Sequence, residues 1–304
     1  PCTKTEYRTD KHFDVKRGGG IIGKVELPGG KYRLLSVLGR GATSVVYLAE
    51  KTGSGKRYAV KVSICDREKL RREAFLLQKF SYPGIPCAVE LLESGTKSFL
   101  VMEAVNGKSI GQRMRKGERF SSREILKTGI ALSGILCYLH AQNPPVFYRD
   151  LKPENIRIRV DGRAGILDLG CLWNREQDWS GAGNRSFSAP EQFVPGEIPG
   201  EESDVYAVGR LLAVMLGDDT DGTVRQSGGI RRRNAEKRCG RKDQRQEKWL
   251  RKVIAMATCE ERKDRIPEIK MLRTLLMVTD DSGRERKRAC RAADFYYVRK
   301  LYCP

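Results

Sequence analysis

The run from Tyr148 to Asn155, Tyr-Arg-Asp-Leu-Lys-Pro-Glu-Asn, holds the residue types best suited to chemistry in this chain. Asp150 could orient a substrate hydroxyl and accept its proton, as a general base does. Asn155 and Asp168, the latter in a downstream Asp-Leu-Gly sequence, offer the oxygen atoms that Mg²⁺ prefers as ligands. The residue types and their spacing therefore indicate a site where a hydroxyl group reacts beside a magnesium ion.

Two further motifs are suited to holding phosphate. The Gly-Arg-Gly sequence at residues 39–41 lies between two predicted strands, where glycines let backbone N–H groups approach phosphate oxygens closely. Lys61 follows in an apolar strand, and Glu73, on a predicted helix, could pair with it and hold its ammonium ready for phosphate oxygens. A glycine-rich hairpin is usually only a hairpin, and a strand lysine usually faces solvent. The order of the motifs, completed by Ala-Pro-Glu at 189–191, therefore carries the interpretation.

In this order, the motifs resemble the signatures of eukaryotic-type serine/threonine protein kinases, in a style similar to bacterial members. The resemblance covers about residues 31–278. It implies a bilobal α+β fold, with a five-stranded N-lobe that holds one main helix and a mostly helical C-lobe. It also implies transfer of the γ-phosphate of ATP to serine or threonine hydroxyls of protein substrates, with Mg²⁺ or Mn²⁺ as cofactor, a signalling role and autophosphorylation.

The resemblance also assigns roles to single residues. Those that would bind ATP are Leu38, Gly39, Gly41, Ser44, Val46, Ala59, Lys61, Met102, Glu103, Val105 and Arg157. The catalytic residues would be Asp150, Lys152, Lys61 and Glu73, and the metal ligands would be Asn155 and Asp168. Structural or regulatory roles would fall to Arg149, Glu191, Asp204, Arg265, Ser180 and Ser186.

The chain departs from the family pattern at some of these positions. Arg157 stands where an aliphatic residue usually lies under the adenine. Its methylene stem could cover the ring, or its guanidinium could stack on it, which puts nucleotide affinity and choice in question. Asn184 replaces a threonine that normally links to the loop lysine. A phosphate on Ser180 or Ser186 would pair with Arg149 and regulate activity, and the alternative is that both are plain linker serines.

Short strands and one helix must position the phosphate-binding motifs. Residues 1–30 are polar and rich in glycine, and they are predicted to form a flexible N-terminal extension. We place an N-lobe at 31–103 and a C-lobe at 104–280. The N-lobe would hold the helix Glu68–Phe80 and five strands, at Tyr32–Leu38, Val45–Leu48, Tyr58–Val62, Val89–Leu92 and Phe99–Met102.

The C-lobe region is predicted to be mainly helical. Ser121, with Glu124 three residues later, fits a capping box, so a helix should begin there and run to about His140. Asn-Pro-Pro at 143–145 would end it, because proline supplies no helical N–H group. Further elements are expected at Ile156–Val160 and Gly165–Leu167 as strands, and at Asp204–Leu216, Lys248–Ala257 and Ile269–Val278 as helices.

Charge is the strongest compositional feature. The chain has 304 residues with 58 Lys+Arg against 38 Asp+Glu, so its formal net charge is +20. Residues 222–252 hold 12 Lys/Arg and three Asp/Glu, and residues 281–304 hold seven and three. We expect an irregular basic insertion at 222–247 and a basic C-terminal tail at 281–304. Clusters at 222–252 and 284–291 could recruit acidic protein substrates, nucleic acid or an anionic surface, and composition leaves these three open.

The cysteine content and the hydropathy narrow the cellular location and the class of the protein. Nine scattered cysteines without a CxxC pair, and only two histidines, argue against a zinc site or a disulfide framework and favour a cytoplasmic location. No apolar stretch approaches the ~18 residues that a membrane helix needs. Other functions remain open: a pseudokinase scaffold, a small-molecule kinase of similar fold, and a nucleic-acid-binding protein with this fold.

Overall fold

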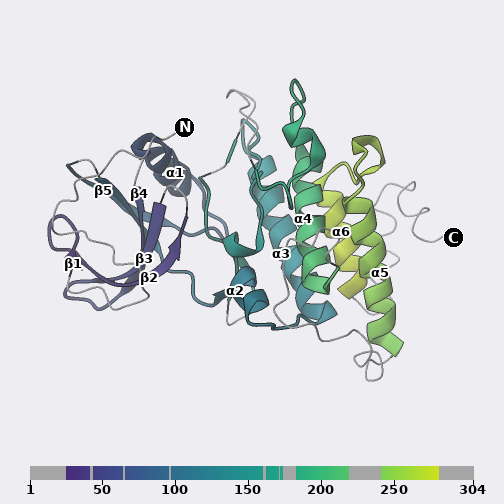
Figure 1. Ribbon diagram of the computed structural model, residues 1–304, viewed down its shortest axis with the longest axis horizontal. Helices are drawn as coiled ribbons and strands as arrows, with labels where there is room; N and C mark the ends of the chain where they lie inside the picture. The colour runs from purple at the N-terminus through teal and green to yellow at the C-terminus, as the bar shows by residue number, and fades with distance from the viewer. Residues whose placement is uncertain are drawn as a thin grey trace. The chain divides into compact units, whose positions relative to one another are not determined.

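The computed structural model describes residues 25–41, 44–63, 66–95, 97–159, 162–170, 172–173, 183–218 and 241–280. The chain divides into two compact units. Unit 1 comprises Pro1–Ser81 and Pro86–Val105, and unit 2 comprises Tyr82–Ile85 and Asn106–Pro304. Figure 1 follows both units along the chain, from purple at the N-terminus to yellow at the C-terminus.

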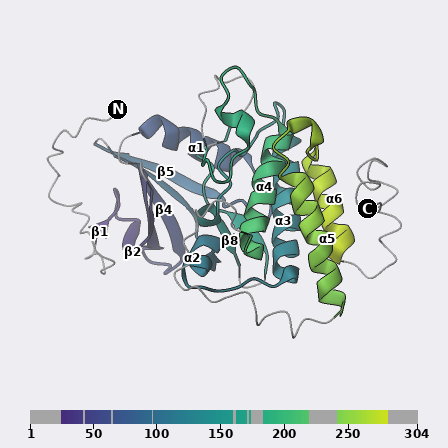
Figure 2. The ribbon, with the colours of Figure 1, turned by 45° about the vertical axis from the view of Figure 1, so that its right-hand side comes forward.

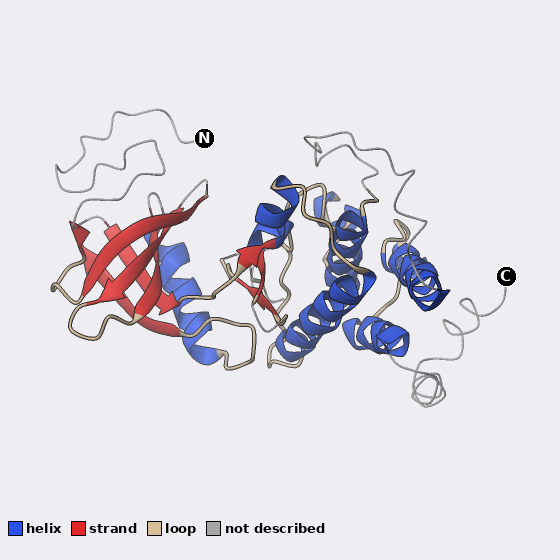
Figure 3. Ribbon diagram, turned by 90° about the horizontal axis from the view of Figure 1, so that it is seen from below, coloured by secondary structure: helices blue, strands red, loops and turns tan. Residues whose placement is uncertain are grey.

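Unit 1 is built on a six-stranded antiparallel sheet with the strand order β1-β2-β3-β4-β6-β5. Strands are drawn in red in Figure 3. The strands are β1 (Val25–Glu26), β2 (Tyr32–Arg40), β3 (Ser44–Lys51), β4 (Arg57–Ser63), β5 (Ala88–Ser94) and β6 (Lys97–Glu103). The five predicted strands are thus confirmed.

The additional strand, β1, pairs Val25 with Leu34 of β2. It lies inside the segment predicted to be a flexible extension, so that prediction is wrong for residues 25 and 26. Two residues are too few to show an alternating pattern, which is why the sequence did not reveal this strand. Residues 1–24 of the expected extension, and the expected tail at 281–304, lie outside the described residues.

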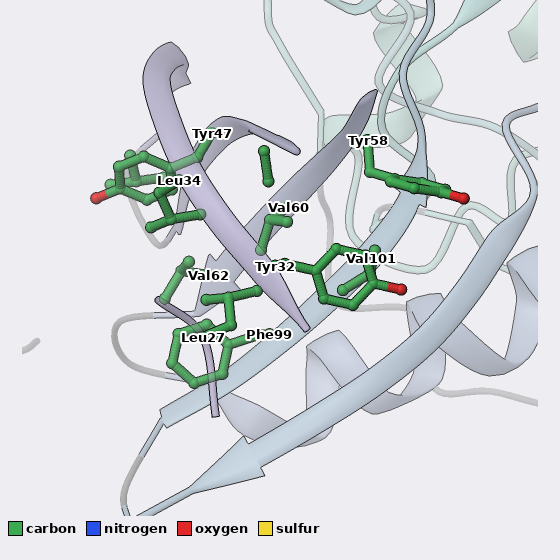
Figure 4. Packing of buried hydrophobic residues seen from close by; sticks show 11 residues of the cluster. Leu27, Tyr32, Leu34, Tyr47, Tyr58, Val60, Val62, Phe99 and Val101 are labelled. Carbon is green, nitrogen blue, oxygen red and sulfur yellow. The ribbon is translucent and has the colours of Figure 1, made fainter. Parts of the chain in front are cut away.

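A hydrophobic core covers one face of the sheet. Figure 4 shows side chains from four strands and from Leu27 pointing toward one another around Val60. The cluster consists of Leu27, Tyr32, Leu34, Val45, Tyr47, Ala49, Tyr58, Val60, Val62, Phe99 and Val101. Because successive side chains of a strand face opposite sides, Val46, Ala59 and Lys61 lie on the other face. The register pairs Lys61 with Val46 on one side and with Leu100 on the other, so Lys61 is central on that face.

One helix of unit 1, α1 (Arg67–Lys79), confirms the prediction for this region. Asp66 caps its N-terminus by accepting a hydrogen bond from the N–H group of Lys69 at 2.9 Å. Its buried residues are Leu70, Glu73, Ala74 and Leu77, which is the spacing of one helical face. A glutamate within this apolar stripe requires a buried partner.

Unit 2 is mainly helical. Its helices are α2 (Ile110–Arg115), α3 (Ser122–His140), α4 (Glu201–Leu216), α5 (Arg241–Ala257) and α6 (Ile269–Asp280), and Figures 1 and 2 show α3 to α6 side by side. A small sheet combines β7 (Lys108–Ser109), β8 (Ile156–Ile158) and β9 (Ala164–Ile166). The predicted capping box is confirmed, because Ser121 Oγ accepts from the N–H of Glu124 while Glu124 accepts from the N–H of Ser121. Among the described residues, no helix is long and apolar enough to cross a membrane.

Helix α5 corrects the expectation of an irregular insertion at 222–247. The helix begins at Arg241 rather than at Lys248, so residues 241–247 are helical. Arg, Lys, Gln and Glu are good helix formers, and this polar turn extends the helix whose buried side carries Trp249, Leu250 and Val253. The sequence did not reveal the start of this helix, because its first turns contain no apolar residues. Residues 219–240 of the expected insertion lie outside the described residues.

In unit 2, a buried ion pair connects the segment before α4 to the segment before α6. Arg265, which is fully buried, donates to Glu191 Oε1 at 2.6 Å and Oε2 at 3.1 Å. Arg265 also donates to the carbonyls of Cys259, Glu202 and Glu260 at 2.9–3.0 Å. Burial alone would raise the pKa of Glu191, but the hydrogen bonds from Arg265 and Ser203 outweigh it and hold that pKa below its usual range.

We predict that Arg265→Met lowers the free energy of unfolding by about 3–5 kcal/mol, because it leaves the charge of Glu191 buried without its partner. Arg262→Ala is the matched control: the side chain of this nearby arginine is 41% exposed where it pairs with Glu202, so its loss should cost about 1 kcal/mol or less. Urea unfolding followed by tryptophan fluorescence measures both. Equal, small losses in the two variants would show that the buried pair does not stabilise the fold.

Candidate active site

Lys61 and Glu73 form a buried ion pair within unit 1. Lys61 Nζ lies 2.6 Å from Glu73 Oε2, and the two residues are only 7% and 2% exposed. The pair forms because Lys61 is central on the sheet face opposite the core, while α1 presents Glu73 to it. Since an ammonium carries three protons, the carboxylate fixes its position and leaves it able to donate to further acceptors such as phosphate oxygens.

The Gly-Arg-Gly turn connects β2 to β3 and is exposed. The N–H of Gly41 donates to the carbonyl of Ser44 at 2.8 Å, which closes the turn. A Cβ atom added at Gly39 would have no neighbour within 4 Å, and one at Gly41 would meet only Ser44 atoms at 3.6 and 3.7 Å. The backbone of the turn is therefore accessible to a ligand. Ala42 and Thr43 lie outside the described residues.

The other unit 1 residues expected to bind ATP are distributed along the same strands. Leu38 and Gly39 lie near the end of β2, Ser44 and Val46 lie at the start of β3, and Ala59 precedes Lys61 on β4. Met102 and Val105, at and after the end of β6, are buried, whereas Glu103 between them is exposed. The register places Ala59 opposite Met102.

Asp150 is the centre of a polar cluster in unit 2. Lys152 Nζ donates to Asp150 Oδ2 at 2.5 Å. Asn155 Nδ2 donates to the carbonyl of Asp150 at 3.2 Å and to its Oδ2 at 3.3 Å. Asp150 is 9% exposed, so its carboxylate is held in one orientation with limited access to water. A carboxylate fixed in this way can accept a proton from a hydroxyl placed beside it.

Asp204, at the start of α4, holds the backbone that precedes Asp150. Its Oδ2 accepts from the N–H of Tyr148 at 2.9 Å, and its Oδ1 accepts from the N–H of Arg149 at 3.0 Å. Arg149 has φ +66°, and no other non-glycine residue of the described part has a positive φ. Such a conformation costs about 1–3 kcal/mol and persists only where neighbouring groups enforce it. Ser188 Oγ contributes as well, by donating to the carbonyl of Arg149 at 3.2 Å.

His140 also contacts the carboxylate of Asp204. Its Nε2 lies 2.8 Å from Asp204 Oδ2, and its Nδ1 lies 3.3 Å from Glu201 Oε2. Burial alone would lower the pKa of His140, but the carboxylates of Asp204 and Glu201 outweigh it and raise that pKa to about 9. His140 is therefore a cation at neutral pH. Sequence reasoning used His140 only as the end of a helix, because nothing in the local sequence connects it to a residue 64 positions away.

Asn155 and Asp168 are brought together by the backbone between β8 and the segment after β9. The N–H of Leu167 donates to the carbonyl of Asn155 at 2.8 Å, and Tyr148 Oη donates to the carbonyl of Asp168 at 2.7 Å. Since Asn155 Nδ2 points at Asp150, the Oδ1 atom of the same amide is the one that could face a cation. Asp168 Oδ1 accepts from the N–H of Gly170 at 2.8 Å, which orients that carboxylate.

These two residues fit a divalent metal through oxygen ligands. No group of three or more His, Cys, Asp or Glu side chains that could hold a metal exists in the part of the chain that the structure describes. A cation bound at Asn155 and Asp168 would therefore need further oxygen ligands, such as phosphate or water.

Two residues expected at the site have other contacts. Arg157 Nη1 donates to the carbonyl of Gly107 at 3.0 Å, and burial lowers the pKa of its guanidinium. The Arg149 side chain is 8% exposed and lies with its guanidinium 5.9 Å from the centre of the Trp173 ring.

Asn184 and Ser186, the latter one of the two candidate phosphorylation sites, lie in one local turn. The N–H of Ser186 donates to Asn184 Oδ1 at 3.0 Å, so this amide closes a local turn. Ser180 lies outside the described residues.

Comparison with known proteins agrees with the motif order. A protein-family profile described as "Protein kinase domain" matches residues 32–267. The chain is similar to sperm motility kinase 3A of Mus musculus, with 31% identity over 194 residues, which are 61% of this chain and 38% of that protein.

Similarity extends to plant proteins. It reaches 29% over 200 residues with CBL-interacting protein kinase 21 of Oryza sativa subsp. japonica, covering 62% of this chain and 38% of the relative. It reaches 28% over 202 residues with CBL-interacting serine/threonine-protein kinase 9 of Arabidopsis thaliana, covering 62% and 44%. The chain thus spans roughly two fifths of the length of these relatives.

We predict that His140 makes stability depend on pH. Because its pKa is raised from 6.5 to about 9, its contribution is complete below pH 6.5 and is lost as pH rises through 9. One pKa unit corresponds to about 1.4 kcal/mol, so the loss is about 3 kcal/mol. His140→Gln, which cannot be protonated, lacks this contribution. Urea unfolding of both proteins between pH 6 and 9.5 should show their difference shrinking with pH, and a constant difference would contradict the assignment.

Proposed function

This chain belongs to the protein kinase family, and we propose that it transfers the γ-phosphate of ATP to serine or threonine hydroxyls of protein substrates. One observation carries the proposal: Asp150, Lys152 and Asn155 form a single hydrogen-bonded cluster on a loop that Asp204 holds in place. Similarity to relatives named as serine/threonine kinases supports the choice of hydroxyl. We further propose that the N-lobe covers residues 31–103 and the C-lobe residues 104–280.

In this proposal Asp150 is the catalytic base. Its carboxylate orients the substrate hydroxyl and accepts the proton while the oxygen attacks the γ-phosphorus, and the bond from that phosphorus to the bridging oxygen of ADP breaks. Lys152 donates to Asp150 Oδ2, and in this proposal it would also stabilise the negative charge on the transferred group. Such a mechanism needs little covalent chemistry from the protein and depends on positioning and charge compensation.

Residues of unit 1 would hold the nucleotide. The exposed turn at 39–41 would offer N–H groups to the phosphates, and Lys61, fixed by Glu73, would donate to phosphate oxygens. Val46, Ala59 and Met102 would contact the adenine, and backbone groups from Glu103 to Val105 would hydrogen-bond it. Leu38 and Ser44, beside the turn, would complete the nucleotide site.

A divalent cation, Mg²⁺ or Mn²⁺, would be held by Asn155 and Asp168. When bound, the cation offsets the negative charge of the phosphates. The orientation of the Asn155 amide, with Nδ2 on Asp150 and Oδ1 on the other side, supports this role.

Arg157 gives this site an unusual property. Its guanidinium is already bonded to the carbonyl of Gly107, which favours the methylene stem rather than the charged group as the part available to cover a base. The arginine that stands here in place of the usual aliphatic residue would then change the affinity for the nucleotide without preventing its binding.

Regulation and partners form the remainder of the proposal. A phosphate on Ser180 or Ser186 would pair with Arg149, and autophosphorylation could supply it. The basic clusters at 222–252 and 284–291 would recruit acidic protein substrates. A signalling role and a cytoplasmic location are part of the same proposal. The likeness to bacterial members stays a prediction, since the relatives named above come from a mouse and from plants.

We predict that Asp150→Asn lowers the rate of phosphate transfer by about 10²–10⁴-fold, because the amide cannot accept the proton. ATP binding should stay within about twofold of wild type, since the substitution keeps the size of the side chain. Transfer is measured with γ-³²P-ATP and phosphosite mapping, and binding by titration calorimetry.

Asp66→Asn is the matched control, because asparagine caps α1 as well as aspartate does and Asp66 has no role in the proposed transfer. This variant should keep full activity. Near wild-type transfer by Asp150→Asn would exclude Asp150 as the base. Bound ATP without any transfer by the wild-type protein would favour a pseudokinase scaffold instead.

A further inference from the structure

Unit 2 carries a group of surface cations that the proposed reaction does not use. Lys116, Arg119, Arg123 and Lys127 lie between the end of α2 and the second turn of α3, and all four are exposed. We name these four residues the α2–α3 basic surface.

The acidic residues of the same stretch are occupied by other partners. Arg113 lies 2.9 Å from Glu118 and 3.2 Å from Glu124, and Lys108 lies 2.8 Å from Glu118. Glu124 also accepts from the N–H of Ser121 in the capping box. None of the four surface cations forms an ion pair with any residue in the described ranges.

This arrangement differs from an ordinary solvated helix face. On such a face, opposite charges four residues apart usually support the helix. Arg123 and Lys127 are four residues apart on α3 and carry the same charge, which weakens the helix unless an anion lies between them. An anion bound between Arg123 and Lys127 would remove this repulsion.

The backbone that carries the cations is fixed before any partner arrives. The guanidinium of Arg113 lies 4.3 Å from the centre of the Phe120 ring, and the N–H groups of Lys116 and Gly117 donate to carbonyls of α2. Ser121 and Glu124 cap α3 reciprocally. A partner that binds here has less backbone to order, so more of the charge attraction is available for affinity.

The same surface is connected to the loop that carries Asp150. Arg115 of α2 lies 3.2 Å from Glu154, which stands between Lys152 and Asn155. At Gly111, an added Cβ would lie 2.8 Å from Glu154 Oε1, so α2 packs directly on this loop. A segment bound next to α2 is therefore held beside the element that performs the proposed chemistry.

We propose that the α2–α3 basic surface docks an acidic segment of the protein substrate, whose Asp and Glu carboxylates pair with these cations while a hydroxyl elsewhere in the same chain receives the phosphate. The proposal rests on the proposed kinase activity and adds a docking site for its acidic substrates besides the clusters at 222–252 and 284–291. Charge complementarity carries it. An acidic peptide fits better than a single-stranded nucleic acid, which would also need aromatic side chains on which its bases stack. Phe120, the one aromatic residue of 113–127, is covered by Arg113 and not open to base stacking.

The test is binding of a fluorescein-labelled 12-residue peptide of Glu and Gly, followed by anisotropy at 150 mM salt. A K116Q/R119Q/R123Q/K127Q variant removes the four charges. Single exposed charge pairs are weak, so we expect the four together to weaken peptide binding about tenfold. The same peptide with Gln in place of Glu should not bind measurably to the wild-type protein.

The matched control is K51Q/K79Q/K263Q/K270Q, which removes four exposed lysines elsewhere and changes the net charge equally. It should stay within about twofold of wild type, since distant exposed charges are screened. Equal weakening by both variants would mean that only net charge matters and would overturn the proposal. Should the quadruple variant unfold, K116Q/R119Q and R123Q/K127Q separately must each weaken binding.

Location and ligand class are tested directly. A benzophenone-bearing acidic peptide should crosslink to residues 113–127, and crosslinks confined to 222–252 or 281–304 would overturn the proposal. A 20-nucleotide RNA and vesicles with 30% phosphatidylserine are further probes. If the quadruple variant no longer binds the RNA or the vesicles but still binds the peptide, the α2–α3 basic surface binds that other ligand and the proposal is wrong.

The binding measurement does not require catalysis, so the outcome is independent of whether the kinase activity itself is found. If peptide docking fails while phosphate transfer occurs, the docking proposal alone is wrong. If transfer is absent but the peptide binds at 113–127, the surface is real and the proposed function is wrong.

Discussion

Three groups converge on the carboxylate of Asp204: the backbone N–H groups of Tyr148 and Arg149 and the imidazole of His140. These groups come from two parts of unit 2, since His140 ends α3 and Tyr148 and Arg149 lie on the loop, while Asp204 lies in the first turn of α4. The left-handed conformation of Arg149 would be unfavourable in an isolated loop. Asp204 therefore links the packing of α3 and α4 to a fixed position for Asp150, and the cluster that Lys152 and Asn155 form with Asp150 depends on this link.

Buried charged residues in both units are held by partners of opposite charge. Lys61 is paired with Glu73, His140 with Asp204 and Arg265 with Glu191, and in each pair both residues are almost fully buried. An unpaired charge at such depth would cost several kcal/mol, so each pair constrains the elements that carry its two members. The pairs join α1 to β4, α3 to α4, and the segment before α4 to the segment before α6. Stability and the positioning of the site are thus supplied by the same contacts within each unit.

The sequence predicted most of the elements because strand alternation and helix capping are local patterns. Ser121 with Glu124 is one example, and the alternation around Lys61 is another. β1 was missed because its two residues show no period, and the start of α5 was missed because its first turns are polar. The order of the motifs led to Asp150, Asn155 and Lys61 as candidates. Contacts between distant residues carry no local pattern, so the link from His140 to Asp204 and that from Arg157 to Gly107 appear only in the folded chain.

The central claim is that the charge of Asp204 positions Asp150 for phosphate transfer. Its most direct test is single-turnover transfer from Mg-ATP to serine or threonine by Asp204→Asn, compared with wild type in samples whose folding is verified by circular dichroism. The account predicts transfer slower by about 10²-fold, because the loop loses its fixed geometry while the atoms that react remain present. A folded Asp204→Asn protein that transfers phosphate at the wild-type rate would contradict the account.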